Sequence, residues 1–162
     1  MIKQDPEKNS DSINSLNETD ASKEFSPKIN IDAQYIKDLS FENPIGPSFQ
    51  TNLDQEPEIN IDINTGGRPL KDGSFELTLQ FRVEATLDRS TVFLLELTYG
   101  AVIRITGVPE ETKNTVLLIE GSRLIFPFAR NIIADTTRDG GFPPLFLQPI
   151  DFMELYQNQH LQ

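Results

Sequence analysis

Cysteine and tryptophan are absent from this chain of 162 residues, and histidine occurs only once, as His160. Without cysteine there is no disulfide framework, no thiol nucleophile and no cysteine-ligated zinc or iron–sulfur cluster. This composition is compatible with a reducing compartment. A catalytic or metal site that needs histidine would rest on His160, in a terminal helix that should fray. The sequence therefore does not favour these chemistries.

Long apolar runs are also missing. The longest, such as residues 92–95, are far shorter than the roughly 18 apolar residues that a membrane-spanning helix needs. Residues 1–7 lack the apolar region of a signal peptide. We therefore expect a cytoplasmic protein.

Positive charge is scarce. Lys and Arg number 14 against 25 Asp and Glu, which gives a net charge of −11 and a pI near 4.4. A field of this sign repels phosphate backbones and anionic lipid, so we expect neither nucleic acid nor a membrane surface as partner. The acidity favours basic partners, although solubility alone is an alternative explanation.

Sequence motifs for catalysis are absent or incomplete. There is no phosphate-binding loop, and Gly46 begins a stretch that lacks the closing glycine of a nucleophile elbow. Residues 62–66 begin like a calcium loop, but Gly73 stands where the bidentate glutamate is required. Asp135 and Asp139, four residues apart, are more typical of a solvated helix face than of acid–base catalysis. We expect a protein that binds other polypeptides and is not an enzyme, with no cofactor and no metal.

The pattern along the chain predicts a polar arm followed by one α+β domain. Residues 1–28 contain almost no large apolar groups and should be disordered, whereas residues 29–162 should form the domain. Period-two alternation predicts strands over residues 29–42, 59–64, 75–87 and 93–105, with Gly100 marking a bulge or a close approach. After these strands the apolar residues recur at helical spacing. This pattern predicts a first helix after Pro109, which Gly121 breaks, and a third helix from Asp151. It predicts a second helix over residues 124–138, whose inward residues are Leu124, Phe128, Ile132 and Ile133. Four antiparallel strands followed by helices indicate a sheet with helices packed on one face.

Two surfaces of this domain have unusual composition. The loop of residues 142–147 carries two phenylalanines and two leucines among prolines, and is either a lid buried on its own core or the wall of a groove or subunit contact. The polar sheet face carries Asp38, Glu42 and Glu96 with one apolar residue, Leu94, and is either solvated or a docking site.

Three stretches together resemble SecB, the chaperone family of bacterial preprotein export. They are YIKDLSFENP at residues 35–44, FLLE at 93–96, and IFPFAR at 125–130 followed by GFPPL at 141–145. The resemblance spans residues 30–161. It implies a four-stranded antiparallel sheet with helices on one side, assembled as a dimer of dimers through the helices after Pro109 and through Arg130. It also implies an ATP-independent holdase that keeps unfolded secretory precursors translocation-competent and delivers them to the translocase ATPase SecA.

The resemblance also implies two binding surfaces. The zinc-binding tail of SecA would dock on Asp38, Glu42, Leu94 and Glu96. Client chains would lie in an apolar groove formed by Phe49, Leu53, Ile59, Ile61, Ile63, Phe142, Pro144, Phe146, Phe152 and Tyr156. Leu53 stands where some relatives have an aromatic residue, so we expect a shallower pocket at that position.

Two other functions fit part of the pattern. A SecB-like chaperone could serve a toxin–antitoxin pair instead of export, although the acidic docking set favours export. An α+β enzyme or small-ligand-binding protein could use the same apolar cavity, but it would need convergent polar groups that the inward strand positions do not supply.

Overall fold

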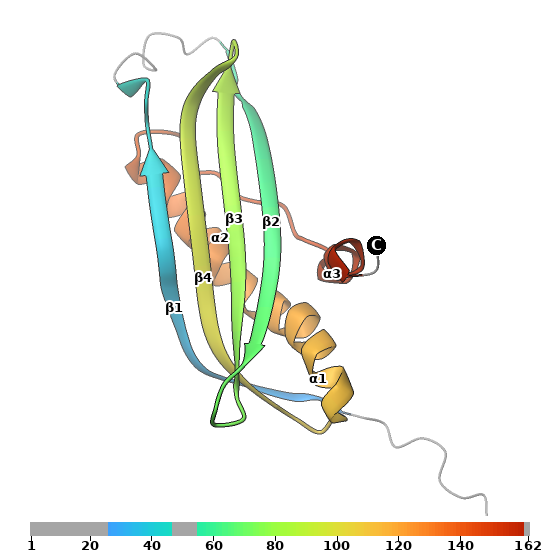
Figure 1. The fold of residues 1–162 in the computed structure, drawn as a ribbon. Helices are drawn as coiled ribbons and strands as arrows, with labels where there is room; N and C mark the ends of the chain where they lie inside the picture. Colours follow the sequence, from blue (N-terminus) through green and yellow to red (C-terminus); the bar gives the residue numbers. More distant parts are fainter. Residues whose placement is uncertain (1–25, 47–54, 161–162) are drawn as a thin grey trace, which may run out of the picture.

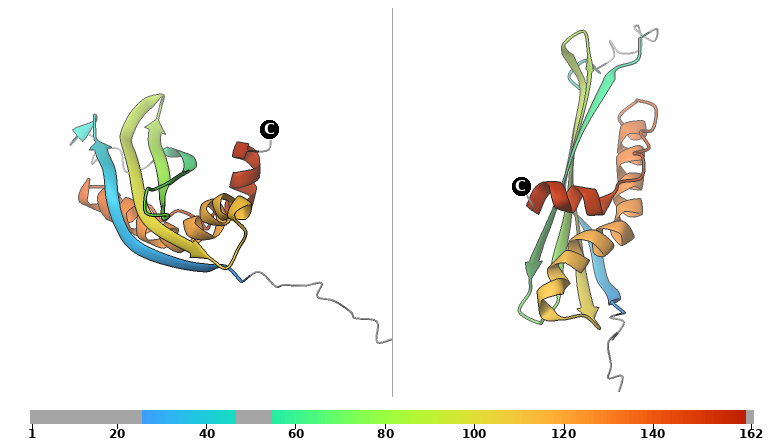
Figure 2. Two further views of the ribbon diagram at one scale, coloured as in Figure 1. Left: turned by 60° about the horizontal axis from the view of Figure 1, so that its bottom comes forward. Right: turned by 90° about the vertical axis from the view of Figure 1, so that its right-hand side faces the viewer.

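The computed structural model describes residues 26–46 and 55–160 as a curved four-stranded sheet with helices on one side (Figures 1 and 2). The polar arm predicted over residues 1–28 lies almost wholly outside the described residues and stays a prediction, as do Phe49 and Leu53 of the groove. The elements are β1 (Lys28–Glu42), β2 (Glu58–Pro69), β3 (Phe75–Leu87), β4 (Ser90–Thr106), α1 (Glu110–Val116), the π-helical segment η2 (Leu117–Gly121), α2 (Ser122–Asp139) and α3 (Phe152–His160).

The sheet has the strand order β1-β4-β3-β2, and every neighbouring pair is antiparallel. A two-residue turn joins β3 to β4, with positive φ at Asp88 and Arg89, as the mirror-image turns of tight hairpins require. β1 and β2 are therefore the two edges of the sheet. The predicted α+β class with a four-stranded antiparallel sheet is confirmed.

The hydrophobic core lies between one sheet face and the helical segments. Alternate residues of β3 and β4 point into it, and η2 and α2 supply the opposing side chains. The largest fully buried side chains include Leu77, Leu79, Leu95, Leu97, Ile103, Leu117, Ile125 and Ile133. We call this side of the sheet the helix face and the opposite side the outer face.

Gly121 does not break the helix, contrary to the sequence prediction. Its backbone is helical (φ −58°, ψ −45°), and α1, η2 and α2 follow one another without an intervening loop. A Cβ atom at Gly121 would lie 3.0 Å from Leu77 and 3.2 Å from Ile103. The glycine therefore permits a close approach of helix to sheet, and the helices cross behind the sheet diagonally (Figure 1).

The inward side of α2 was also only partly predicted. Ile133 is buried, but Leu124 and Phe128 are 46% and 51% exposed, and Ile125 and Phe126 take the inward positions instead. Both sides of α2 carry large apolar residues, so helical periodicity alone could not select the stripe that faces the sheet.

β1 departs from strict alternation at two irregularities, after Ile31 and after Ile36. The first moves Tyr35 to the outer face, opposite Gly100, where a Cβ atom on the glycine would lie 2.6 Å from the tyrosine ring. The close approach predicted at Gly100 is thus confirmed, and the bulges lie on the neighbouring strand. The second irregularity restores the alternation with which β1 began. Asp38 therefore lies on the outer face, as predicted.

Candidate functional site

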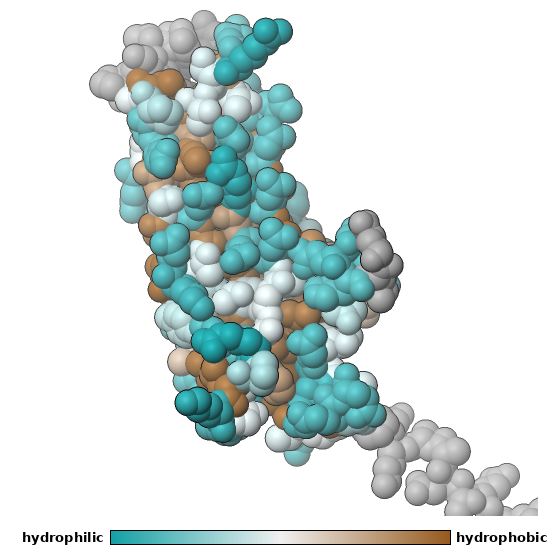
Figure 3. Space-filling model, in the orientation of Figure 1, coloured by the Kyte–Doolittle hydropathy of each residue, from teal (hydrophilic) through white to brown (hydrophobic). Residues whose placement is uncertain are grey.

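The four predicted SecA-binding residues lie together on the outer face. In the register of β1 and β4, Glu42 pairs with Leu94, and Ser40 pairs with Glu96, next to Asp38. Two-residue steps along each strand keep these side chains on one face. Hydrophilic residues cover much of this face, with strips of hydrophobic residues between them (Figure 3).

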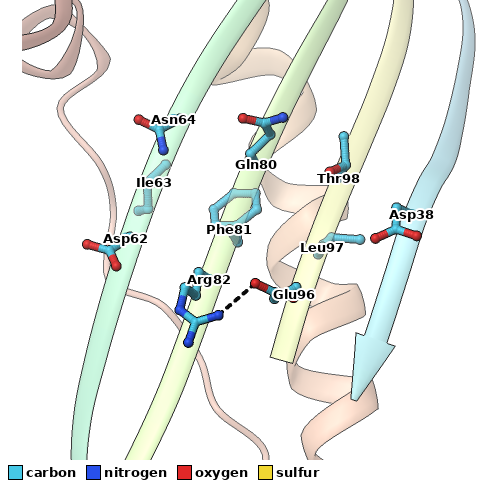
Figure 4. A pocket seen from close by; sticks show the side chains of 10 residues that line it. All are labelled: Asp38, Asp62, Ile63, Asn64, Gln80, Phe81, Arg82, Glu96, Leu97 and Thr98. Carbon is cyan, nitrogen blue, oxygen red and sulfur yellow. Dashed lines mark hydrogen bonds and ion pairs between the residues drawn. The ribbon is translucent and has the colours of Figure 1, made fainter. Parts of the chain in front are cut away.

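A hollow of about 540 Å³ opens on this face across all four strands (Figure 4). Asp38 and Glu96 line it, as does Asp62 from β2, whereas Glu42 and Leu94 lie beyond its lining. The hollow therefore extends the predicted acidic surface towards the β2 edge. Its described lining consists of Asp38, Asp62, Ile63, Asn64, Gln80, Phe81, Arg82, Glu96, Leu97 and Thr98.

Sequence reasoning did not assign a role to Arg82, which lies inside this acidic surface. Its Nη1 donates to Glu96 Oε1 at 2.7 Å, and its Nη2 lies 3.6 Å from Glu84 Oε2. The hydrogen bond to Glu96 is the main cause that raises the pKa of Arg82 above its ordinary value. The alternation of β3 already placed Arg82 and Glu84 on the polar face, so the signal was present in the sequence.

A second polar cluster on the outer face is centred on Glu76. This side chain is only 6% exposed and accepts hydrogen bonds from the Tyr35 hydroxyl, from Lys37 Nζ at 3.1 Å and from Arg68 Nε. The hydrogen bond from Tyr35 is the largest cause that lowers the pKa of Glu76 to about 2, and burial, followed by Glu76 itself, raises the pKa of Tyr35 to about 12. The Tyr35 ring reaches Glu76 by crossing β4 above Gly100. The cluster therefore links β1 and β2 to β3.

The predicted client-binding residues are distributed over several places. Ile59, Phe142 and Pro144 line a hollow of about 450 Å³, together with Phe93, which was not predicted. Phe93 stacks on Phe41 with ring centroids 5.6 Å apart, and Phe142 lies 5.0 Å from Phe93. The described lining is mostly apolar: Gln55, Glu56, Pro57, Ile59, Phe93, Gly141, Phe142, Pro143, Pro144 and Leu145.

The remaining described groove residues lie away from this hollow. Ile61 is 41% exposed on β2, and Phe146 is 57% exposed with the Arg130 guanidinium 5.7 Å from its ring centroid. Phe152 is 2% exposed and packs edge-on against Phe126, so it supports the surface from the core.

The other two lie near different neighbours. Ile63 lines the outer hollow, and the Tyr156 hydroxyl lies 3.1 Å from Thr115 Oγ1.

Within residues 26–46 and 55–160, no three His, Asp or Glu side chains are placed to hold a metal ion. Over the same residues, no helix is both long and apolar enough to span a membrane. The described residues form two hollows on opposite faces of a single sheet, a mostly apolar one on the helix face and one lined by three acidic residues on the outer face.

Comparison with known proteins places this arrangement in a family. The family model described as preprotein translocase subunit SecB matches residues 22–162. "Protein-export protein SecB" of a Bradyrhizobium species is 51% identical over 84% of this chain and 85% of its own length. The protein of the same name from Parvibaculum lavamentivorans is 47% identical over 84% of this chain and 81% of its own. The chain belongs to the SecB family.

The fold agrees with a solved structure of the same kind. A SecB-like chaperone from Mycobacterium tuberculosis, in complex with a peptide from an antitoxin, superposes with a TM-score of 0.63. The match covers 75% of this chain and 90% of that one, at 13% identity. At this identity the likeness shows the shared fold.

Proposed function

We propose that this protein is an ATP-independent cytoplasmic holdase, not an enzyme, which binds unfolded secretory precursors and delivers them to SecA. One observation carries the proposal: consecutive residues of β4 serve two different surfaces. Phe93 lines the apolar hollow, while Leu94 and Glu96 belong to the acidic outer face. A chaperone that captures one polypeptide while docking on another needs two such surfaces on one rigid element.

The apolar hollow suits an unfolded client chain. Burying about 1,000 Å² of apolar client surface is worth roughly 25 kcal/mol before costs are counted. Ordering a flexible client offsets most of this, so binding should be reversible and weakly selective for sequence. Aromatic rings and prolines, with few polar groups, supply contact area without the convergent donors and acceptors of a small-molecule site.

The acidic surface suits a basic segment of a partner. Asp38, Glu42 and Glu96 place carboxylates on neighbouring strands, and Leu94 adds an apolar contact between them. We assign this surface to the zinc-binding tail of SecA. Coulombic attraction would speed the encounter and make docking sensitive to salt.

We further propose that four chains assemble as a dimer of dimers through α1 and α2. Leu124 and Phe128 present large exposed apolar side chains on α2. A helix that is apolar on both sides is typical of one that is covered on both sides. Several grooves on one tetramer would add avidity for a long client.

Export is favoured over service to a toxin–antitoxin pair because relatives about 50% identical are named protein-export proteins. The antitoxin peptide belongs to a relative at 13% identity.

Refolding of a slow-folding secretory precursor tests this function. Without ATP, stoichiometric protein should arrest refolding, and light scattering should give the mass of four chains. Pro144→Asp should weaken capture about fivefold or more, because it places a charge against the apolar client. Gln148→Asp, at an exposed position of the same loop, is the matched control. Unimpeded refolding or a monomeric mass would contradict the proposal.

A further inference from the structure

Arg82 occupies the middle of the acidic surface on which a basic partner is expected to dock. In the sheet register it lies between Asp62 on β2 and Glu96 on β4. Three of the described residues that line the outer hollow are carboxylates, namely Asp38, Asp62 and Glu96, and Arg82 is the only cation among them. Figure 4 shows its guanidinium turned towards Glu96.

The contact between Arg82 and Glu96 is weak enough to be exchanged. It consists of one hydrogen bond, from Nη1 to Oε1 at 2.7 Å, and the side chains are 44% and 47% exposed. Exposed single-contact ion pairs contribute little because water and salt screen them. A lysine or arginine of a partner can therefore take the place of Arg82 at Glu96.

We propose that Arg82 is a built-in competitor for the docking carboxylate Glu96. While paired, it occupies Glu96 as a partner's cation would. Arg82 thereby lowers the affinity of the acidic surface for basic segments and keeps docking reversible. This inference rests on the proposed docking of the SecA tail and adds a residue that sets its strength.

The opposite role for Arg82 would be to hold Glu96 in the geometry that the partner needs. The two roles predict opposite signs. Removal of a competitor strengthens docking, whereas removal of a positioning residue weakens it. The sign of one measurement therefore separates them.

The test is binding of the zinc-loaded SecA tail, as a synthetic peptide, to the full chain by titration calorimetry at about 0.1 M salt. Arg82→Gln should bind the peptide about two- to fivefold more tightly, in line with the small strength of an exposed ion pair. The gain should disappear when Glu96→Ala is present in the same chain, because Glu96 is the group for which Arg82 competes.

Arg104→Gln is the matched control. Arg104 also lies on the outer face and pairs with Asp32 at 2.9 Å and Asp72 at 3.5 Å. It is eight positions from Glu96 along β4, which corresponds to roughly 26 Å. That distance exceeds the screening length of about 10 Å at this salt concentration, so peptide affinity should stay unchanged.

The outcomes separate this inference from the function on which it rests. If Glu96→Ala weakens binding while Arg82→Gln leaves it equal or weaker, the competitor role is wrong and the docking function stands. If neither the wild-type chain nor Arg82→Gln binds the peptide, the competitor role and the proposed docking function are both wrong. Equal gains from Arg82→Gln and Arg104→Gln would mean that net charge alone sets affinity, which also overturns the competitor role. Thermal unfolding of each variant checks that the fold is retained.

Discussion

The buried carboxylate of Glu76 provides a test of how one residue stabilises the sheet. Its ordinary pKa of 4.5 is lowered to about 2, first by the Tyr35 hydrogen bond and further by Lys37 and Arg68. A lowered pKa means that the charged form stabilises the folded state above pH 4.5, and that this stabilisation is lost as the pH falls from about 4.5 to about 2. Glu76→Gln should therefore lower the free energy of unfolding by about 2 kcal/mol near pH 7. The difference from wild type should shrink progressively below pH 4.5 and approach zero only near pH 2.

Denaturant unfolding as a function of pH measures this difference. Glu84→Gln is the control, since Glu84 lies on the same strand with its side chain 34% exposed. Its substitution should change stability by no more than about 0.5 kcal/mol. A Glu76→Gln cost that persists unchanged at pH 2 would mean that shape, and not charge, determines the role of this residue.

At the scale of elements, α3 protects an open sheet edge through one side chain. Gln159 donates from Nε2 to the Ile63 carbonyl at 3.2 Å, and its Oε1 accepts from the Thr65 N–H at 3.4 Å and the Thr65 hydroxyl at 3.0 Å. The side-chain amide thus pairs with β2 as a neighbouring strand would, and in Figure 1 α3 stands beside that strand. Unpaired strand edges are prone to add further strands.

Gln159→Ala should therefore expose this part of β2. The Thr65 amide should exchange with solvent about fivefold faster, which corresponds to the loss of about 1 kcal/mol of hydrogen bonding. Amide exchange followed by NMR measures the rate. Gln157→Ala, at an exposed position of the same helix, should leave it unchanged. Equal rates in both variants would show that Gln159 does not protect the edge.

Most of the fold could be predicted because a strand with one buried face shows alternating apolar and polar residues in its sequence. β3 shows this best: Leu77 to Ala85 alternate between buried and polar positions without interruption. β1 could be predicted only outside its two irregularities, since a bulge changes which face a residue occupies without changing its local sequence pattern. Gly121 was misread because a glycine required for close packing is, in sequence, indistinguishable from one that ends a helix.

The positions of the acidic residues could be predicted more fully than those of the predicted groove, because the acidic residues follow the local pattern of two strands. Asp38, Glu42 and Glu96 lie on two adjacent strands. The alternation of side chains along each strand and the pairing register between the strands place them on one face of the sheet. The predicted groove combines residues from strands, a loop and a helix. Their mutual placement depends on tertiary packing, and the structure distributes them over several places. The family resemblance named Phe142, which lines the apolar hollow, but omitted Phe93 from the same lining.

At the scale of the whole molecule, the central question is whether the two surfaces act independently. β4 contributes to both, and consecutive side chains on a strand point to opposite faces. A rigid sheet would let each surface be changed without disturbing the other. Coupled surfaces would instead transmit the loss of one to the other.

We expect Asp38→Ala combined with Glu96→Ala to abolish binding of the SecA tail while capture of an unfolded client persists. Raising the salt concentration from about 0.05 M to about 0.5 M should likewise weaken SecA binding more than client capture, because only the former is mainly driven by charge. Asp139→Ala combined with Glu154→Ala removes the same number of charges from exposed helix positions and should affect neither activity.

Peptide titration and refolding arrest, measured on the same preparations, give the two readouts. Loss of both activities in the first variant, with its fold retained, would show that the surfaces are coupled. Retention of SecA binding would place the docking site elsewhere on the molecule.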